Sequence, residues 1–541
     1  MHRWQHRPAS PLRVPPRPTP AFTWSPRRFR PVPLPATGIA HALTRQYLCL
    51  YNYCMNTIKI ANASPQALSA ARQNVILGIC CLSLLAVSMD ATIVNVALPD
   101  IRKDLQASLS GLQWVIDAYT IVLASFLMLG GSLADRFGRR RVFQVGMALF
   151  TAGSLLCSLA ASIGWLVAAR VIQALGGSMM NPVAMSIIVH TFRAPKARAR
   201  AIGIWAAVAG LAMALGPLAG GVLTQTLGWH AIFWINLPIG ALSLWLTARY
   251  VPESRAPQAR QPDPVGQALL LTGLAALVYA VIEGSRGGAV TYAAALLAAI
   301  AFAGLVAYER RRHEPLLDVR FFHSLPFSAA TGIAVCMFAA MGGFLFLNSL
   351  YLQDVRGWSA LHAGMGILPT AIAVMIVSPL SGRLVASHGA RPSLLVSGAM
   401  LTLSALMLAR LDTQTPIVEL LSVYALFGVG FGMVNAPVTY AAVSGMPRAQ
   451  AGLASAVAST SRQIGVSVGV ALAGALAGSP VAGADRASVG FVQATHTFWW
   501  IVAGCGVLIL VLAVWSTGAY ARASTARIAH LLQDPDAGAE A

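Results

Sequence analysis

Residues 131–140 read Gly-Ser-Leu-Ala-Asp-Arg-Phe-Gly-Arg-Arg and close the second long apolar run of the chain. A related stretch, Gly382-Arg-Leu384-Val-Ala-Ser-His-Gly389-Ala-Arg391, closes another long apolar run in the second half of the chain. The two glycines, the leucine and the last arginine coincide at identical spacing. The apolar runs form two blocks of six, at 74–250 and 326–517, and each stretch closes the second run of its block. The sequence therefore indicates an internal repeat of two parallel halves, an arrangement typical of membrane transporters.

Working outward from these stretches, fourteen apolar runs follow one another, each about as long as the 20 residues that a helix needs to cross a bilayer. They lie near 74–98, 112–134, 142–162, 165–189, 201–224, 229–250, 265–283, 289–308, 326–352, 361–386, 391–410, 416–440, 452–478 and 496–517. Transmembrane strands would alternate with period two over about ten residues, whereas these runs are continuous. The sequence predicts an all-α polytopic membrane protein with fourteen transmembrane helices.

The repeat divides the chain into two six-helix bundles joined by a linker with two extra helices. The bundles are expected at 74–250 and 326–517 and the linker at 251–325. Residues 1–73 are rich in proline and arginine and are expected to form a disordered tail, with Met55 as an alternative true start. Residues 518–541 are expected to form a second, cytoplasmic tail.

Composition and charge fit a membrane protein. The chain is 57% hydrophobic and 10% charged, against about 25% charged in soluble proteins. Its formal net charge of +20 comes from arginines between the apolar runs. Eighteen basic residues follow even-numbered runs and six follow odd-numbered runs, which places both termini in the cytoplasm by the positive-inside rule. The basic loops therefore account for the positive charge. We expect the lipid bilayer of the inner (plasma) membrane to be a partner of the chain, and no nucleic acid.

Three motifs resemble those of the major facilitator superfamily. The first is Gly131 to Arg141, which resembles the loop between its helices 2 and 3. The second is Leu166-Val-Ala-Ala-Arg170-Val-Ile-Gln173-Ala-Leu-Gly176-Gly177, which resembles its helix-4 motif. The third runs from Gly203 through Ala212 to Gly216-Pro217 and Gly220-Gly221, and is similar to the helix-5 motif associated with antiporters. Ala174 and Ala212 stand where the family usually has glycine.

Three further stretches are similar to the fourteen-helix drug:proton antiporters of the EmrB/QacA type. They are Met89 to Pro99, Trp229 to Gly240, and Tyr351-Leu352-Gln353 through Gly357, Ala363, Gly364 and Pro369. This resemblance implies an antiporter that exports amphipathic drugs or toxic organic compounds by alternating access. It implies a proton as the coupling ion, no other cofactor, and a small amphipathic substrate as partner.

Other functions remain open at this stage. The exporter could serve a single metabolite or natural product, and it could work with a periplasmic adaptor. An enzyme embedded in the membrane would need His, Asp or Cys clustered at one membrane face, whereas the eleven histidines are scattered singly. The seven cysteines have neither metal-ligand spacing nor an even count, which argues against a zinc site and a disulfide framework. The sequence contains no Gly-x-x-x-x-Gly-Lys-Ser/Thr loop, the motif that binds nucleotide phosphates, so it does not indicate ATP as the energy source.

Three charged residues inside the runs of the first half are candidates for proton coupling. Asp90 lies inside the first run, Asp117 lies about five residues into the second, near the outer interface, and Arg170 lies in the fourth. A charge inside a membrane costs about 2.5–3.5 kcal/mol, so such residues face a cavity or a partner. We expect Asp90 to bind the proton and Arg170 to pair with Asp90 or Asp117. The alternative is a purely structural set of hydrogen bonds and ion pairs.

The motif after the second run is a candidate conformational latch. Its residues are Gly131, Asp135, Arg136, Gly138 and Arg139. A carboxylate at Asp135 can bind the amide donors at the start of a helix, which contributes about 0.3–2 kcal/mol. The thirteenth run begins near Gly452 on the same side of the membrane, so we expect Asp135 to join the halves there. The alternative is that the motif only sets topology by its charge.

The last candidates are small and polar residues within the runs. Gly216, Pro217, Gly220 and Gly221 form the antiporter-helix motif, which either packs tightly or blocks a leak. The substrate cavity is assigned to six residues; the alternative for the aromatic ones is a place in a helical core or facing lipid. They are Asn95, Gln173, Phe344, Asn348, Tyr351 and Arg462.

Overall fold

The computed structural model describes residues 69–527 except 257–261, 285–286, 313–314, 445, 447–449, 478–483, 519, 522 and 526. Its helices are α2 (Ala70–Asp104), α3 (Leu109–Phe137), α4 (Arg139–Ser158), α5 (Ile163–Thr191), α6 (Pro195–Leu227), α7 (Ala231–Trp234), α8 (Asn236–Tyr250), α9 (Pro264–Ile282), α10 (Ala289–Glu309), α11 (Leu325–Leu350), α12 (Ala360–His388), α13 (Ala390–Leu408), α14 (Ile417–Val443), α15 (Ala451–Ala477) and α16 (Ala484–Trp515). A 3₁₀ turn, η2 (Val319–His323), precedes α11, and a π-helical turn, η3 (Tyr351–Val355), extends it.

The predicted membrane-spanning character is confirmed. Thirteen spans within the described residues are long and apolar enough to cross a bilayer, with α7 and α8 counted together as Ala231–Tyr250. The remaining run is α15, which forms a helix of 27 residues. Its mean hydropathy is lowered by Arg462 and Gln463, which are polar residues in the middle of the helix. All regular structure in the described residues is helical.

Local signals explain several helix starts. The hydroxyl of Ser108 accepts a hydrogen bond from the backbone N–H of Gly111, and Ser162 and Ser359 cap α5 and α12 in the same way. Such caps satisfy backbone donors that have no partner inside the helix. The first helix starts at Ala70, so the last residues of the predicted 1–73 tail are helical. The rest of that tail, including Met55, and residues 528–541 lie outside the described residues.

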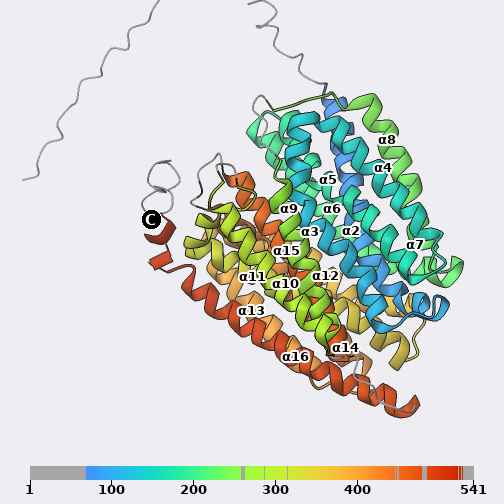
Figure 1. The fold of residues 1–541 in the computed structure, drawn as a ribbon. Helices are drawn as coiled ribbons and strands as arrows, with labels where there is room; N and C mark the ends of the chain where they lie inside the picture. Colours follow the sequence, from blue (N-terminus) through green and yellow to red (C-terminus); the bar gives the residue numbers. More distant parts are fainter. Residues whose placement is uncertain are drawn as a thin grey trace, which may run out of the picture. The chain divides into compact units, whose positions relative to one another are not determined.

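The helices α2–α8 form one group, called here the N-group, and α11–α16 form another, the C-group (Figure 1). In the N-group α2 packs on α6 and α3 packs on α5, and in the C-group α11 packs on α15 and α12 packs on α14. The repeated glycines also match, because Gly138 and Gly389 both connect two helices with a positive φ, +109° and +78°. Glycine adopts this conformation without the steric penalty of a side chain. The two groups therefore share local geometry as well as sequence pattern.

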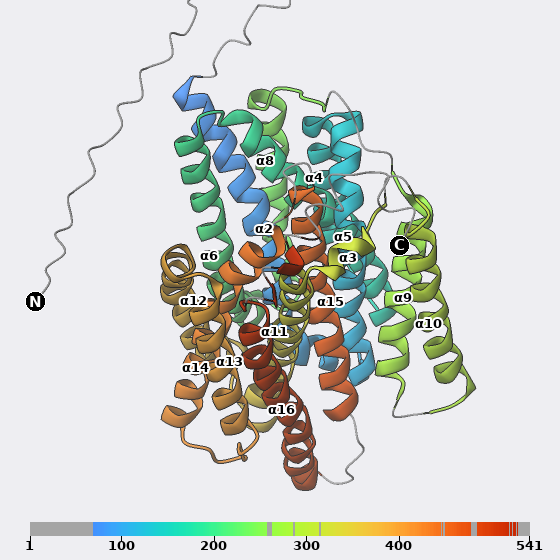
Figure 2. The same cartoon turned by 90° about the vertical axis from the view of Figure 1, so that its left-hand side faces the viewer.

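The two groups meet along a seam made by two helix pairs, α6 with α12 and α3 with α15. Gly221 of α6 lies so close to α12 that a Cβ placed on it would be 2.7 Å from the Ala360 carbonyl oxygen. The linker helices α9 and α10 lie side by side next to α3 (Figure 2). Leu270, Leu274 and Val278 of α9 pack with Ile121 of α3 and Ala471 of α15. The linker therefore contacts both sides of the seam.

Two ends of this helical unit are distinguished below. At the Trp229 end, α2 and α6 finish and α12 begins. At the Asp135 end, α3 finishes and α4, α9 and α15 begin.

Candidate functional site

A buried ion pair lies at the centre of the N-group. Arg170 of α5 donates a hydrogen bond of 2.6 Å from Nη1 to Oδ2 of Asp90 on α2. Both side chains are shielded from solvent, with side-chain exposures of 2% and 0%. A charge inside a membrane-spanning helix requires such a partner or water. The structure therefore brings together two of the three predicted proton-coupling residues.

Three polar side chains complete the surroundings of Asp90. Gln173 lies one helical turn after Arg170, accepts a hydrogen bond from it at 2.6 Å, and donates to Asp90 Oδ1 at 2.8 Å. Asn236 of α8 donates to the same oxygen at 3.2 Å. Ser154 of α4 accepts hydrogen bonds from both amides, at 2.7 Å from Gln173 and 3.2 Å from Asn236. Side chains from α5 and α8 thus bind the carboxylate on α2, and Ser154 of α4 positions both amides, so the position of the carboxylate is strongly constrained.

The guanidinium of Arg170 has two further contacts, both on α3. Its Nε donates to the carbonyl oxygen of Val115 at 3.2 Å. Its Cζ lies 4.0 Å from the ring centre of Tyr119, a distance at which a cation is attracted to the ring face. The Asp90–Arg170 pair therefore connects α2 and α5 with α3, the helix that carries Asp117.

Asp117 occupies a different environment from Asp90. Its side chain is fully buried, and Ser467 of α15 donates to its Oδ1 at 3.0 Å. Its other oxygen, Oδ2, has no hydrogen-bond partner in the described part of the chain. The sequence placed Asp117 near the outer interface, and this depth stays a prediction; the structure adds that α15 of the other group covers the side chain. Asp117 thus lies on the seam, whereas the Asp90 network lies entirely within the N-group.

Hydrogen bonds hold the seam closed toward the Trp229 end. Ser349 donates to the carbonyl oxygen of Asn95, and Gln353 donates to the carbonyl oxygen of Val96 at 2.8 Å. On the α3–α15 side, Gln113 donates to the Ala471 carbonyl oxygen at 2.8 Å. The C-group supplies one partner of each bond and the N-group supplies the other.

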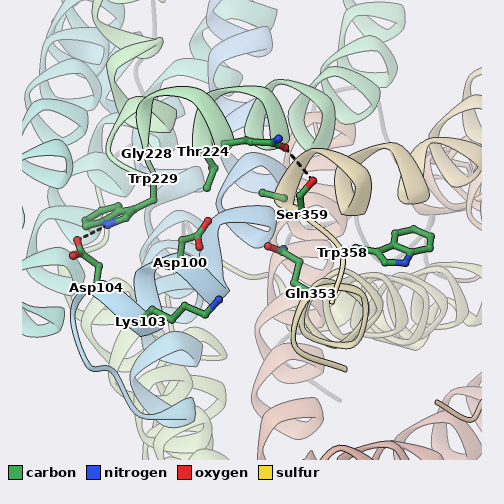
Figure 3. A pocket seen from close by; sticks show the side chains of 11 residues that line it. Asp100, Lys103, Asp104, Thr224, Gly228, Trp229, Gln353, Trp358 and Ser359 are labelled. Carbon is green, nitrogen blue, oxygen red and sulfur yellow. Dashed lines mark hydrogen bonds between the residues drawn. The ribbon is translucent and has the colours of Figure 1, made fainter. Parts of the chain in front are cut away.

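A cavity of about 670 Å³ opens at the Trp229 end (Figure 3). Asp104 accepts a hydrogen bond from the indole N–H of Trp229 at 2.8 Å on one side of it. Ser359, which caps α12, donates to Gln225 of α6 at 3.0 Å on the other side. The cavity is lined by both groups, so it marks where they would separate if the seam opened at this end.

A second cavity, of about 300 Å³, lies at the Asp135 end. Asp135 of α3 and Gly452 of α15 both line it. The carboxylate of Asp135 accepts a hydrogen bond from Arg139 at 3.0 Å and from no other described residue. The contact expected between Asp135 and the start of α15 is therefore not formed in this structure, because the cavity separates them. The closed latch stays a prediction.

The other latch residues bind the segment that follows α8. The backbone N–H of Arg139 donates to the Ser254 carbonyl oxygen at 2.9 Å. Ala256 donates in turn to the Asp135 carbonyl oxygen at 3.2 Å, and Glu253 accepts a hydrogen bond from the Arg140 backbone N–H at 3.1 Å. The motif is thus joined to the start of the linker.

The two remaining latch residues make other contacts. Gly131 lies against Pro182 of α5, and Arg136 lies over the Phe137 ring, 5.6 Å from its centre.

The antiporter-helix motif lies between α2 and α12. A Cβ on Gly220 would lie 2.9 Å from the Ile93 carbonyl oxygen of α2, and one on Gly216 would overlap Thr92. Gly221 faces Ala360 of α12, and the Pro217 carbonyl oxygen lies against Gly364 of α12. The motif therefore packs α6 tightly on its own group and across the seam at once.

The six residues assigned to a substrate cavity do not line either cavity among the described residues. Asn95 donates to backbone carbonyls of its own helix, and Gln173 belongs to the Asp90 network. Phe344 stacks on Phe427 with ring centres 4.2 Å apart, in the core of the C-group. Asn348, Tyr351 and Arg462 bind Tyr424, the Asp412 carbonyl oxygen and Thr439 respectively.

The sequence did not identify several residues of the network and the seam. Ser154, Tyr119 and Ser467 are common residue types within apolar runs, and no pattern distinguished them. Asn236 stood in a stretch that supported the family resemblance, but its spacing did not indicate which helix it faces. Among the described residues no group of three or more His, Cys, Asp and Glu side chains is arranged to hold a metal ion.

Comparisons with known proteins agree with the fold. Residues 80–470 match the family model described as Major Facilitator Superfamily. The chain is 40% identical over 398 residues to the multidrug resistance protein Stp of Mycobacterium tuberculosis, covering 73% of this chain and 74% of that one. It is 35% identical over 405 residues to the tetracenomycin C resistance and export protein of Streptomyces glaucescens, covering 74% and 75%. A crystal structure of a bacterial homologue of the lysosomal transporter Spinster superposes with a TM-score of 0.60 at 16% identity, covering 85% of this chain and 99% of that one.

Proposed function

The chain belongs to the major facilitator superfamily, and on that basis we propose that it exports amphipathic drugs or toxic organic compounds in exchange for protons, by alternating access. Similar proteins named for multidrug resistance and for drug resistance and export support the export of such compounds. The proton is the coupling ion, and the buried carboxylates of the N-group are the groups that carry it.

The observation that carries the proposal is the position of Asp117 on the seam. A single hydroxyl from the other group, that of Ser467, covers its carboxylate. If the two groups separate at the Trp229 end, α15 moves away from α3 and water reaches Asp117. Burying an unpaired charge costs about 2.5–3.5 kcal/mol, whereas a protonated carboxyl carries no such charge. Closing the seam over Asp117 is therefore favourable after proton uptake.

The Asp90–Arg170 pair has a complementary role in this proposal. Asp90 accepts hydrogen bonds from Arg170, Gln173 and Asn236, so its negative charge is fully compensated in this state. Movement of Arg170 away from Asp90 would remove this compensation. Arg170 also lies over the ring of Tyr119, which is two residues from Asp117 on α3. Movement of α3 at the seam would therefore change the contacts of Arg170.

The basic loops indicate which end faces the cytoplasm. The Asp135 end carries four basic residues, Arg136, Arg139, Arg140 and Arg141. The positive-inside rule places such loops on the cytoplasmic side of the inner membrane. The seam is hydrogen-bonded toward the Trp229 end, and the Asp135 end has a cavity between the groups. Because the Trp229 end also has a cavity lined by both groups, the hydrogen bonds of Ser349 and Gln353 across the seam, and not the cavities, are what supports a state closed to the outside.

The driving force is adequate for export. A membrane potential of about 100 mV supplies about 2.3 kcal/mol per charge moved. That free energy sustains a concentration ratio of about fiftyfold.

The test is transport by inverted membrane vesicles that carry the protein. An imposed pH gradient should drive accumulation of a fluorescent amphipathic dye, and collapse of the gradient should abolish it. Asp117→Asn and Asp90→Asn should both lose uphill accumulation at normal protein level. Asp100→Asn is the matched control, because this carboxylate lines the cavity at the Trp229 end and lies outside the network. Accumulation that survives in both variants would contradict the proposal.

A dedicated exporter of one natural product is the second candidate. The similarity to a protein named for tetracenomycin C resistance and export favours it. Resistance of cells to a chemically diverse drug panel would separate the two. A multidrug exporter protects against several unrelated compounds, and a dedicated exporter protects against one.

A further inference from the structure

The C-group carries one charged side chain deep within a helix. Among the described residues of α11–α16, Arg462 is the only Asp, Glu, Lys or Arg more than ten residues from both ends of its helix. Its backbone lies about 16 Å along α15 from Ala451, at 1.5 Å per residue, and its guanidinium reaches Thr439, near the end of α14 at Val443. Arg170 at a comparable depth in the N-group is paired with Asp90. No described carboxylate pairs with Arg462.

The surroundings of Arg462 are neutral and aromatic. Its Nη2 donates to the hydroxyl of Thr439 on α14 at 2.6 Å. Its Cζ lies 5.8 Å from the ring centre of Phe338 on α11, and Phe338 contacts Phe431 edge to face at 5.0 Å. Its Nε is buried without a hydrogen-bond partner in the described part of the chain. The guanidinium thus has one N–H donor, at Nε, without an acceptor, and no carboxylate in the described part of the chain compensates its charge.

Thr439 shows which way this cluster faces. α14 packs on α12 through Gly432, and Thr439 follows Gly432 by two helical turns on the same face. On its neighbouring face, α14 packs on α11 through Phe431. Thr439 itself is exposed, so Arg462 reaches a face of α14 that is accessible.

We propose that Arg462 binds a negatively charged, aromatic substrate, with its guanidinium on a carboxylate or phenolate and the rings of Phe338 and Phe431 against the aromatic part. The proposal rests on the export function proposed above and adds the substrate class. A guanidinium is suited to it because its planar set of donors matches a carboxylate. An unpaired cation inside a membrane needs a partner, and an anionic substrate supplies the charge that the C-group lacks.

The experiment measures equilibrium binding to purified protein in nanodiscs of zwitterionic lipid. The probes are naphthoate and naphthylmethylammonium, which share a ring system and differ in the sign of their charge. Wild type should bind naphthoate, and Arg462→Gln should weaken that binding about tenfold or more, because a hydrogen bond to a charged group is lost. Arg462→Lys should weaken it less. Binding of naphthylmethylammonium should be unchanged in all three proteins.

Two controls keep the result specific. Arg383→Gln removes an exposed arginine near the end of α12 and should leave naphthoate binding unchanged. Thr439→Val keeps the charge but removes the hydroxyl that positions it, and should have an intermediate effect. Equal naphthoate binding by wild type and Arg462→Gln, no binding by wild type, or equal loss of both probes would overturn the proposal. Because binding needs no gradient, failure of proton-driven vesicle transport would instead count against the proposed function.

Discussion

Arg170 Nη1 lies 2.6 Å from Asp90 Oδ2, and both side chains are buried inside the N-group. Breaking a buried pair by removing one partner costs about 3–5 kcal/mol, because the other charge is left uncompensated. Removing both charges avoids that cost.

The first prediction concerns the stability of this pair. Asp90→Asn and Arg170→Gln should each lower the unfolding temperature of the detergent-purified protein. The double variant should be more stable than the sum of the two single effects predicts, while export stays lost. The measurement is a double-mutant cycle of thermal unfolding. Strictly additive effects would show that the two side chains do not stabilise each other.

The second prediction concerns the close approach of α6 and α12. A Cβ on Gly221 would lie 2.7 Å from the Ala360 carbonyl oxygen, whereas one on Gly210 of the same helix would contact nothing within 4 Å. Overpacking costs about 1–3 kcal/mol, so Gly221→Val should shift the population about tenfold toward a state open at the Trp229 end. Gly210→Val should not.

Labelling of a cysteine at Ser359 measures this shift, in a variant without the seven native cysteines. Ser359 lines the cavity at the Trp229 end. Faster labelling is expected only with Gly221→Val. Equal labelling rates in the two glycine variants would mean that this contact does not control opening.

The third prediction concerns the latch. If Asp135 binds the start of α15 when the Asp135 end closes, Asp135→Asn loses about 0.3–2 kcal/mol of helix-dipole interaction. The population should then shift toward the state open at this end. A cysteine at Ala456, which lines the cavity there, should be labelled faster. Arg200→Gln, which removes an exposed arginine outside the motif, should have no such effect. Unchanged labelling together with normal transport would exclude the latch.

The fourth prediction concerns pH and lies outside the membrane spans. The backbone N–H of Gln414 and the hydroxyl of Thr415 donate to the carboxylate of Asp412, which lowers its pKa below the usual 3.8. A lowered folded-state pKa stabilises the protein above the unfolded-state pKa, and this stability is lost as the pH falls. Asp412→Asn should therefore unfold at a lower temperature than wild type at pH 7. The difference should begin to shrink below about pH 4 and vanish only below the lowered folded-state pKa, and a difference that does not shrink as the pH falls would contradict the assignment.

Much of the fold followed from the sequence because membrane helices have a strong and local signal. The fourteen runs, the repeat at Gly131 and Gly382, and the all-helical class depend only on length, apolarity and spacing. The pairing of Arg170 with an acid was also expected, since a buried charge needs a partner and two acids were available. Which acid it takes depends on the tilt and rotation of α2, α3 and α5, which no single stretch determines.

The residues assigned to a substrate cavity show where sequence reasoning ends. Phe344 and Asn348 lie in an apolar run, and periodicity does not distinguish a side chain in a helical core from one in a cavity. The structure packs both within the C-group. Asp117 is the opposite case, because its position in the run suggested a shallow site and Ser467, 350 residues away in sequence, buries it.

Proton release on substrate binding tests the central claim most directly. Purified protein in weakly buffered detergent solution is mixed with a transported dye, and a pH indicator records protons released per protein. Wild type should release protons, and Asp117→Asn should bind the dye with little release because the group covered by Ser467 no longer titrates. Release from Asp117→Asn equal to that of wild type would contradict proton coupling at the seam.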